Sequence, residues 1–87
     1  MFYVYVLQDL DEPRRFYLGY TADLRKRVVN HNVGISRYTR KRRWRLVYYE
    51  AYISSKAARR RELRLKRNSR MKGFLMDRIK DSLQEAI

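Results

Sequence analysis

The chain has no cysteine and no long hydrophobic run, and both absences narrow what the protein can be. Without cysteine there are no disulfides and no thiolate metal sites, which fits a reducing cytoplasm. The longest apolar run, residues 1–7, is far shorter than the roughly 20 residues that cross a bilayer. No charged segment precedes this run, so we expect no signal peptide. We therefore expect a cytoplasmic protein without a membrane-spanning segment.

Acidic residues are also scarce, which points to a negatively charged partner. The sequence has 87 residues, with 22 Lys and Arg against 9 Asp and Glu, and a net charge of +13. Such an excess repels itself in the compact state unless a polyanion is a usual partner. Nucleic acid is the first candidate, and an anionic membrane surface is the main rival. A chain this short builds one core, so we expect a single domain over residues 1–87.

The hydrophobic pattern predicts three strands and three helices in the order β-β-α-β-α-α. Residues 2–8 and 16–20 are rich in β-branched and aromatic residues, as strands are. The short polar loop between them holds the only proline and predicts an antiparallel hairpin, because parallel strands need a long crossover. A third strand is predicted over residues 44–52, and helices are predicted over 22–32, 55–67 and from 71 onward.

Polar residues mark the expected helix starts, and apolar spacing marks the buried faces. Thr21 is the expected N-cap of the first helix, with Asp23 in its first turn, and Ser55 is the expected cap of the second. Asn68 and Ser69 either break the second helix or begin the third. The expected buried stripes are Leu24 and Val28 in the first helix, and Met71, Leu75, Ile79 and Leu83, joined by Phe74, in the last.

Glu62 is the only acid between Glu50 and Asp77, in a segment rich in Lys and Arg. One interpretation is a solvated helix face on which Glu62 pairs with Lys66 at i+4. The other rests on position, since Ala58, Glu62 and Leu65 share one stripe of the helix. A carboxylate on an inward stripe needs a partner, and a divalent cation is one such partner. The residue pattern leaves both interpretations open.

Four further residues carry chemistry that suits phosphate, although each also has an ordinary structural explanation. Arg27 and His31 form an i, i+4 pair beside the expected buried stripe. A guanidinium grips phosphate, and an imidazole moves protons near neutral pH. Tyr5 and Tyr17 are expected on adjacent strands, where most tyrosines simply pack. Gly19 is compatible with a bulge or a close backbone approach within a strand.

Taken in order, these residues resemble the signature of the GIY-YIG nuclease superfamily, in particular its small stand-alone bacterial members. The resemblance covers residues 2–67. Tyr17-Leu18-Gly19 resembles the second triad, and the stretch from Tyr17 to His31 follows the strand-to-helix signature of the family. The first triad reads Tyr3-Val4-Tyr5, without the usual glycine, and Tyr20 stands where many relatives carry lysine.

The resemblance implies a mixed α/β fold with a small three-stranded antiparallel sheet flanked by helices. It implies metal-dependent hydrolysis of DNA phosphodiester bonds, with structure-selective or weakly sequence-selective nicking. Glu62 would bind one Mg²⁺ or Mn²⁺, and Arg27 would stabilise the transition-state charge. Tyr5 would help activate water, for which nearby positive charge must favour the phenolate. Tyr17 and His31 would orient the water or phosphate, or relay a proton.

Binding of DNA, with RNA as an alternative, is expected from the basic residues. The expected nucleic-acid-binding residues are Arg40, Lys41, Arg42, Arg43, Arg60 and Arg64. The competing function is a non-catalytic basic module that binds DNA or RNA on the same scaffold. No membrane partner is expected, and a monomer is favoured over an oligomer.

Overall fold

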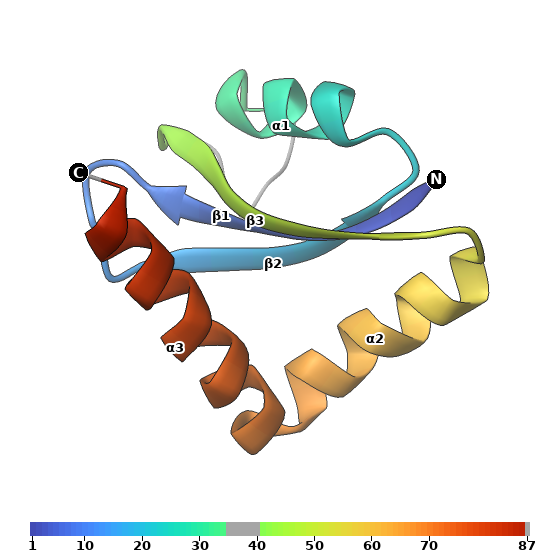
Figure 1. The fold of residues 1–87 in the computed structure, drawn as a ribbon. Coiled ribbons are helices and arrows are strands. Elements are labelled where there is room, and N and C mark those ends of the chain that lie inside the picture. Colours follow the sequence, from blue (N-terminus) through green and yellow to red (C-terminus); the bar gives the residue numbers. More distant parts are fainter. Residues whose placement is uncertain (35–40, 87) are drawn as a thin grey trace.

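A computed structural model describes residues 1–34 and 41–86 of the chain, and its fold is the predicted one. A three-stranded antiparallel sheet carries one short helix on one face and two longer helices on the other (Figure 1). The α/β class and the element order β-β-α-β-α-α are confirmed. The elements are β1 (Phe2–Asp9), β2 (Phe16–Thr21), α1 (Leu24–Asn32), β3 (Trp44–Tyr52), α2 (Ser55–Arg67) and α3 (Ser69–Glu85).

The first strand lies in the middle of the sheet, whose strand order is β2-β1-β3. Both neighbours run antiparallel to β1, and Tyr5 lies between Gly19 on β2 and Tyr49 on β3. The pairing of β1 with β3 shifts register between Val6 and Leu7. Since β2 is an edge strand, residues on it and beside it are open to a partner molecule.

Alternating side chains of β1 build one core on each face of the sheet, as strand geometry requires. Val4 and Val6 pack with Ala58 and Leu65 of α2, and with Leu75 and Ile79 of α3. Tyr5 and Leu7 face the other way and form a smaller core with Trp44, against which Leu24 and Val28 of α1 pack. The inward positions predicted for Leu24, Val28, Ala58, Leu65, Leu75 and Ile79 are therefore confirmed.

Three details of the predicted helices are wrong. The first helix begins at Leu24 rather than Ala22, and its N-cap is Asp23, whose carboxylate accepts from the Lys26 amide. The predicted cap, Thr21, is the last residue of β2 and pairs with Tyr3. The pairing holds Thr21 in an extended conformation, so the helix begins further along the chain, at Leu24.

The other two corrections concern the second and third helices. Ser54 rather than Ser55 caps α2, where it accepts from the Ala57 amide. Phe74 is largely exposed instead of joining the buried stripe of α3. Asn68 both ends α2 and caps α3, accepting from the amides of Arg70 and Met71. This double role settles the choice that the sequence left open between breaking one helix and starting the next.

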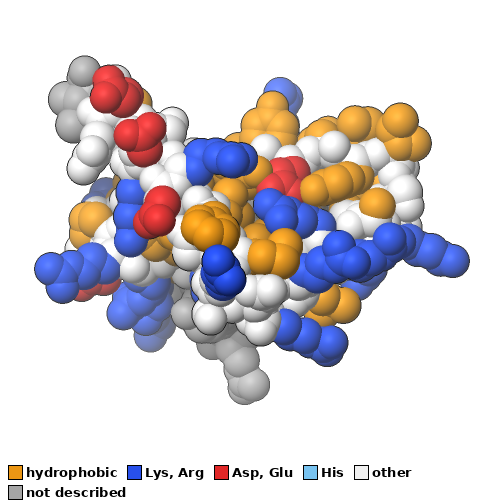
Figure 2. Space-filling model, turned by 60° about the horizontal axis from the view of Figure 1, so that its bottom comes forward, with side chains coloured by type: hydrophobic (Ala, Val, Ile, Leu, Met, Phe, Trp, Pro, Cys, Tyr) orange, Lys and Arg blue, Asp and Glu red, His pale blue; other side chains and the backbone are white. Residues whose placement is uncertain are grey.

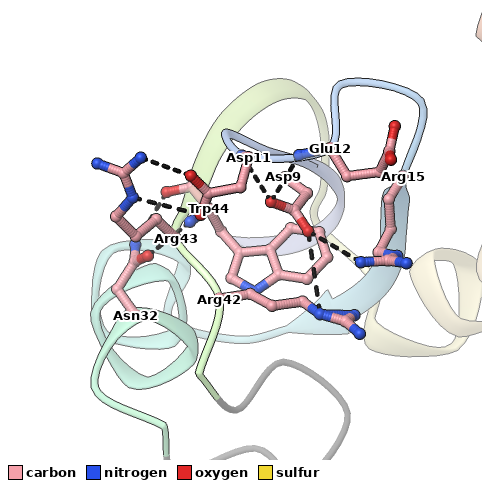
Figure 3. A network of polar contacts seen from close by, with 8 residues as sticks. All are labelled: Asp9, Asp11, Glu12, Arg15, Asn32, Arg42, Arg43 and Trp44. Atoms are coloured by element: carbon pink, nitrogen blue, oxygen red, sulfur yellow. Dashed lines mark hydrogen bonds and ion pairs between the residues drawn. The ribbon is translucent and has the colours of Figure 1, made fainter.

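A buried carboxylate, Asp9, organises the turn between β1 and β2 (Figure 3). It accepts hydrogen bonds from the amides of Asp11 and Glu12 and from Arg15. Although burial raises the pKa of Asp9, these donors outweigh it and hold the pKa below its usual value. The loop is therefore a fixed turn, and its position next to β3 fixes the basic residues that enter that strand.

Candidate active site

Tyr5, Arg27 and His31 form one hydrogen-bonded cluster between β1 and α1. The Tyr5 hydroxyl lies 2.7 Å from His31 Nε2, and Arg27 Nε donates to the same hydroxyl at 3.4 Å. Tyr5 and His31 are fully buried, and Arg27 is half-buried. Arg27 Nε can only donate, so the Tyr5 oxygen accepts there. Three residues predicted to share a site are thus brought into contact.

The two titratable members of this cluster are both uncharged at neutral pH. Burial, and then the adjacent Arg27 charge, lower the pKa of His31 to about 4. Burial also raises the pKa of Tyr5 to about 12, against the opposing effect of Arg27. A neutral imidazole with its proton on Nδ1 accepts a hydrogen bond from the Tyr5 hydroxyl through Nε2. The expected lowering of the Tyr5 pKa by nearby positive charge is absent in the protein alone, because burial outweighs Arg27.

Tyr17 and Gly19 complete the cluster from the edge strand β2. The Tyr17 ring centroid lies 4.7 Å from that of His31 and 6.2 Å from that of Tyr5. Gly19 is buried beneath the Tyr5 ring, and a Cβ at Gly19 would lie 2.6 Å from the Tyr5 hydroxyl oxygen. Glycine is therefore needed for a close approach between phenol and backbone, one of the two explanations that the sequence allowed.

Glu62 lies on α2, which covers the face of the sheet opposite to Tyr5. Its side chain is 14% exposed, and its carboxylate accepts from Lys66 Nζ at 3.1 Å. The helix turns Ala58 and Leu65 fully inward, whereas Glu62 lies on the flank of that stripe. Burial is the main cause of the raised pKa of Tyr5, and the Glu62 charge adds to it. Glu62 therefore shares the electrostatic environment of Tyr5 while pairing with Lys66.

The donor set around Glu62 suits a metal ion that takes most of its ligands from elsewhere. Among residues 1–34 and 41–86, no group of three or more His, Asp or Glu side chains is placed to hold a metal ion. Mg²⁺ commonly binds through one or two carboxylates, and water and substrate phosphates fill its other positions. The single carboxylate of Glu62 is compatible with this mode of Mg²⁺ binding. It is not compatible with a metal ion whose ligands all come from the protein.

The predicted DNA-binding residues around the start of β3 differ in whether they already pair with an acidic side chain. Arg43 donates to Asp11 at 2.7 Å, and Arg42 Nε lies 3.9 Å from the Asp9 carboxylate (Figure 3). Lys41 is exposed and has a positive φ of 64°. Arg40 lies outside the described residues. Asp9 and Asp11 therefore compete with phosphate for two of these arginines.

The two remaining predicted DNA-binding residues, Arg60 and Arg64, are exposed on α2. At 100° per residue they lie about 160° around the helix from Glu62. They are available to a polyanion, but on the side of α2 turned away from the flank that carries Glu62.

Sequence reasoning missed a second polar cluster, centred on Glu50. Its carboxylate accepts from both Nε and an amino group of Arg61, at 2.9 Å each, and from the hydroxyls of Tyr48 and Tyr52. Burial opposes its ionisation, but these donors, led by Arg61, hold the pKa of Glu50 below its usual value. The signal was available, because positions 48, 50 and 52 share one face of a strand. The cluster fixes α2 to β3 through the residue next to Glu62.

No helix in the described parts of the chain is both long and apolar enough to cross a membrane.

On the face that carries α2 and α3, Lys and Arg side chains are spread around a band of hydrophobic ones, and acidic side chains gather towards one end (Figure 2). The positive charge of the sequence is therefore displayed on this face.

Comparison with known proteins agrees with this arrangement. The GIY-YIG catalytic domain matches residues 1–74 of the chain. The chain belongs to the GIY-YIG family. The resemblance suggested by Tyr17-Leu18-Gly19 and the residues that follow is thereby confirmed, although the first triad lacks its glycine. Membership in a nuclease family is consistent with the cluster of Tyr5, Arg27 and His31.

Similar proteins carry names that leave their activity open. Over 58 residues the chain is 47% identical to a UPF0213 protein of Streptococcus pyogenes serotype M3, covering 64% of this chain and 61% of that protein. A UPF0213 protein of serotype M5 matches to the same extent. The chain thus spans less than two thirds of these relatives. A UPF0213 protein from Bacillus halodurans, solved by solution NMR, is 37% identical with a TM-score of 0.54, over 92% of this GIY-YIG chain and 86% of that one.

Proposed function

We propose that this protein is a metal-dependent endonuclease that hydrolyses DNA phosphodiester bonds, with structure-selective or weakly sequence-selective nicking. The observation that carries the proposal is the contact of Tyr5 with both His31 and Arg27. A phenol, an imidazole, a guanidinium and a carboxylate are the groups that such a hydrolysis needs.

The hydrogen bonds of Tyr5 support a route for the proton of the attacking water. As water attacks phosphorus, its proton passes to the Tyr5 oxygen, and the Tyr5 proton passes to His31 Nε2 at 2.7 Å. The low pKa of His31, due first to burial, keeps the imidazole uncharged at neutral pH, and in the tautomer with its proton on Nδ1 this nitrogen accepts the Tyr5 proton. Tyr5 need not ionise beforehand in this scheme, which suits its pKa of about 12. Tyr17 packs against both rings and orients them.

Arg27 and Glu62 have complementary roles at the phosphate. Arg27 keeps Nε on Tyr5 and offers its remaining N–H groups to the phosphate oxygens, where negative charge grows in the transition state. Glu62 would hold one Mg²⁺ or Mn²⁺, which when bound polarises a phosphoryl oxygen and stabilises the leaving oxygen. Exchange of Lys66 for the metal ion at Glu62 is easy, because exposed i, i+4 pairs are weak.

A second function, binding of DNA or RNA without cutting, is favoured by one observation. The Glu62 carboxylate is already neutralised by Lys66, and the described residues offer no cluster of metal ligands around it. A basic domain of this kind would bind nucleic acid largely through phosphates, with little preference for sequence.

Nicking of supercoiled plasmid in Mg²⁺ or Mn²⁺ separates the two functions. We compare wild type with Glu62→Gln and with Asp77→Asn, which removes an exposed carboxylate from α3 and serves as the matched control. Wild type and Asp77→Asn should nick, and Glu62→Gln should bind the plasmid in chelator without nicking it. Equal nicking by all three proteins would remove Glu62 from the mechanism. Tight binding without nicking by any of them would establish the binding module instead.

A further inference from the structure

One flank of α2 carries a row of polar residues that faces the edge strand β2. Ser55, Arg59, Glu62 and Lys66 follow one another at i, i+4, i+7 and i+11, so they lie along one side of the helix. The Arg59 guanidinium carbon lies 4.4 Å above the centre of the Tyr20 ring of β2. Glu62 thus has a cation one turn before it and another one turn after it.

The other basic residues of α2 do not share this flank. Arg61 is committed to Glu50 through a two-pronged ion pair. Arg60 and Arg64 lie about 160° around the helix from Glu62, whereas Arg59 and Lys66 lie within about 60° of it. Position around the helix therefore separates the pair Arg59 and Lys66, which borders the proposed catalytic carboxylate, from the exposed pair Arg60 and Arg64.

The row is long enough for its two cations to flank one phosphate of a DNA strand. With a rise of 1.5 Å per residue, Arg59 lies about 4.5 Å and Lys66 about 6 Å along the axis from Glu62, on opposite sides. Both side chains are long, so each can contact a phosphate next to one that lies at Glu62. We propose that the strand to be cut runs along this flank, with Arg59 and Lys66 binding phosphates on either side of the phosphate at Glu62.

Both cations are held in a state that suits this role. Stacking on Tyr20 fixes the plane of the Arg59 guanidinium and leaves its in-plane N–H groups free to donate. The Lys66 side chain is 46% exposed, and within the described residues it pairs with Glu62 through a weak i, i+4 contact. When a metal ion and a phosphate bind at Glu62, the Lys66 ammonium would leave the Glu62 carboxylate and pair with a phosphate oxygen instead. This binding track deepens the proposed nuclease function and rests on it for the place of the cut.

The test compares two double variants that remove the same charge from the same helix. Arg59→Gln with Lys66→Gln removes the proposed track, and Arg60→Gln with Arg64→Gln is the control. Binding of a fluorescein-labelled forked DNA, which has duplex and single-stranded arms, is titrated in chelator at several salt concentrations. Binding without metal does not depend on cutting, so the result stands apart from the nuclease assay. Thermal melting checks the fold of each variant, and the single variants Arg59→Gln and Lys66→Gln replace the first double if it does not fold.

We expect the track variant to lose at least tenfold in affinity and the control to lose less than threefold. The slope of log K against log salt should become shallower by about 1.8 for the track variant, since two phosphate contacts are lost. Equal losses in the two variants, or a larger loss in the control, would overturn the proposed track. A wild type that binds through the track but never nicks DNA would overturn the nuclease function and leave the track intact.

Discussion

Gly19 and Tyr5 face each other across β1 and β2, and the phenol occupies the space that a side chain at position 19 would need. A methyl group there would lie 2.6 Å from the hydroxyl oxygen and 2.7 Å from the ring carbon that carries it. The hydroxyl that contacts His31 and Arg27 therefore has its position because β2 has no side chain beneath it.

Gly19→Ala should both destabilise the protein and displace the Tyr5 hydroxyl. Overpacking a rigid core costs about 1–3 kcal/mol, which chemical denaturation would measure. Gly73→Ala is the matched control, because nothing lies within 4 Å of its Cβ position. On an exposed helix face that change should stabilise by about 0.5–1 kcal/mol. A Gly19→Ala protein as stable as wild type would show that the Tyr5 ring moves aside freely.

Stability should fall as the pH drops from 6.5 towards 4, because of His31. Its pKa is lowered from 6.5 in the unfolded chain to about 4 in the fold, so the unfolded chain binds the proton first. At pH 4.5 the loss relative to pH 7 should be about 2–3 kcal/mol by urea denaturation. His31→Gln should abolish most of this dependence. The carboxylates of Asp9 and Glu50, whose pKa values are lowered from 3.8 and 4.5, add to the loss chiefly below those values, where the unfolded chain takes up protons first.

Arg27→Lys should cut the nicking rate by about 10²–10³-fold although the charge remains. Lysine has a compact ammonium group in place of the planar guanidinium with its several N–H donors. It therefore cannot donate to Tyr5 and bind a phosphate in the same geometry. Arg25→Lys is the control, because Arg25 is exposed on the same helix. Single-turnover nicking would measure both. Equal rates for the two variants would mean that Arg27 acts only as a positive charge.

Two glutamates paired with cations should respond very differently to removal of their charge. Glu50→Gln should destabilise by about 2–3 kcal/mol, since it leaves the half-buried Arg61 without its carboxylate. Glu62→Gln removes a single i, i+4 contact and should change the free energy of unfolding by less than about 0.5 kcal/mol. Urea denaturation of both variants is the measurement. A large effect at Glu62 would mean that it serves the fold rather than the proposed chemistry.

The elements of this fold were predictable because their signals are local. Residues of β1 alternate between two buried faces, and Leu75 and Ile79 repeat at the spacing of a helix. The errors arose where distant pairing overrode local preference. Thr21 has the chemistry of a helix cap, but pairing with Tyr3 keeps it in β2. The stripe of α3 drifts around the helix along its length, which leaves Phe74 outside it.

The candidate site, like the fold, has features that were predictable from the sequence and features that were not. The resemblance to the GIY-YIG signature grouped Tyr5, Arg27 and His31 in one site, and the packing of α1 on the face that carries Tyr5 brings them into contact. Spacing could not reveal that Arg43 pairs with Asp11, because the loop and strand that hold them are distant in sequence (Figure 3). It also did not reveal that Arg59 stacks on Tyr20, although spacing alone places Arg59 nearer than Arg60 to the flank that carries Glu62.

The approach of Glu62 from the opposite face of the sheet to Tyr5 has a consequence for how the protein is made. β1, β2 and α1 precede α2 in the chain, so they are synthesised before it. A nascent chain that ends within β3 has the phenol, guanidinium and imidazole but lacks the carboxylate. If the protein cuts DNA as proposed, such a partly made chain is harmless until α2 has been added.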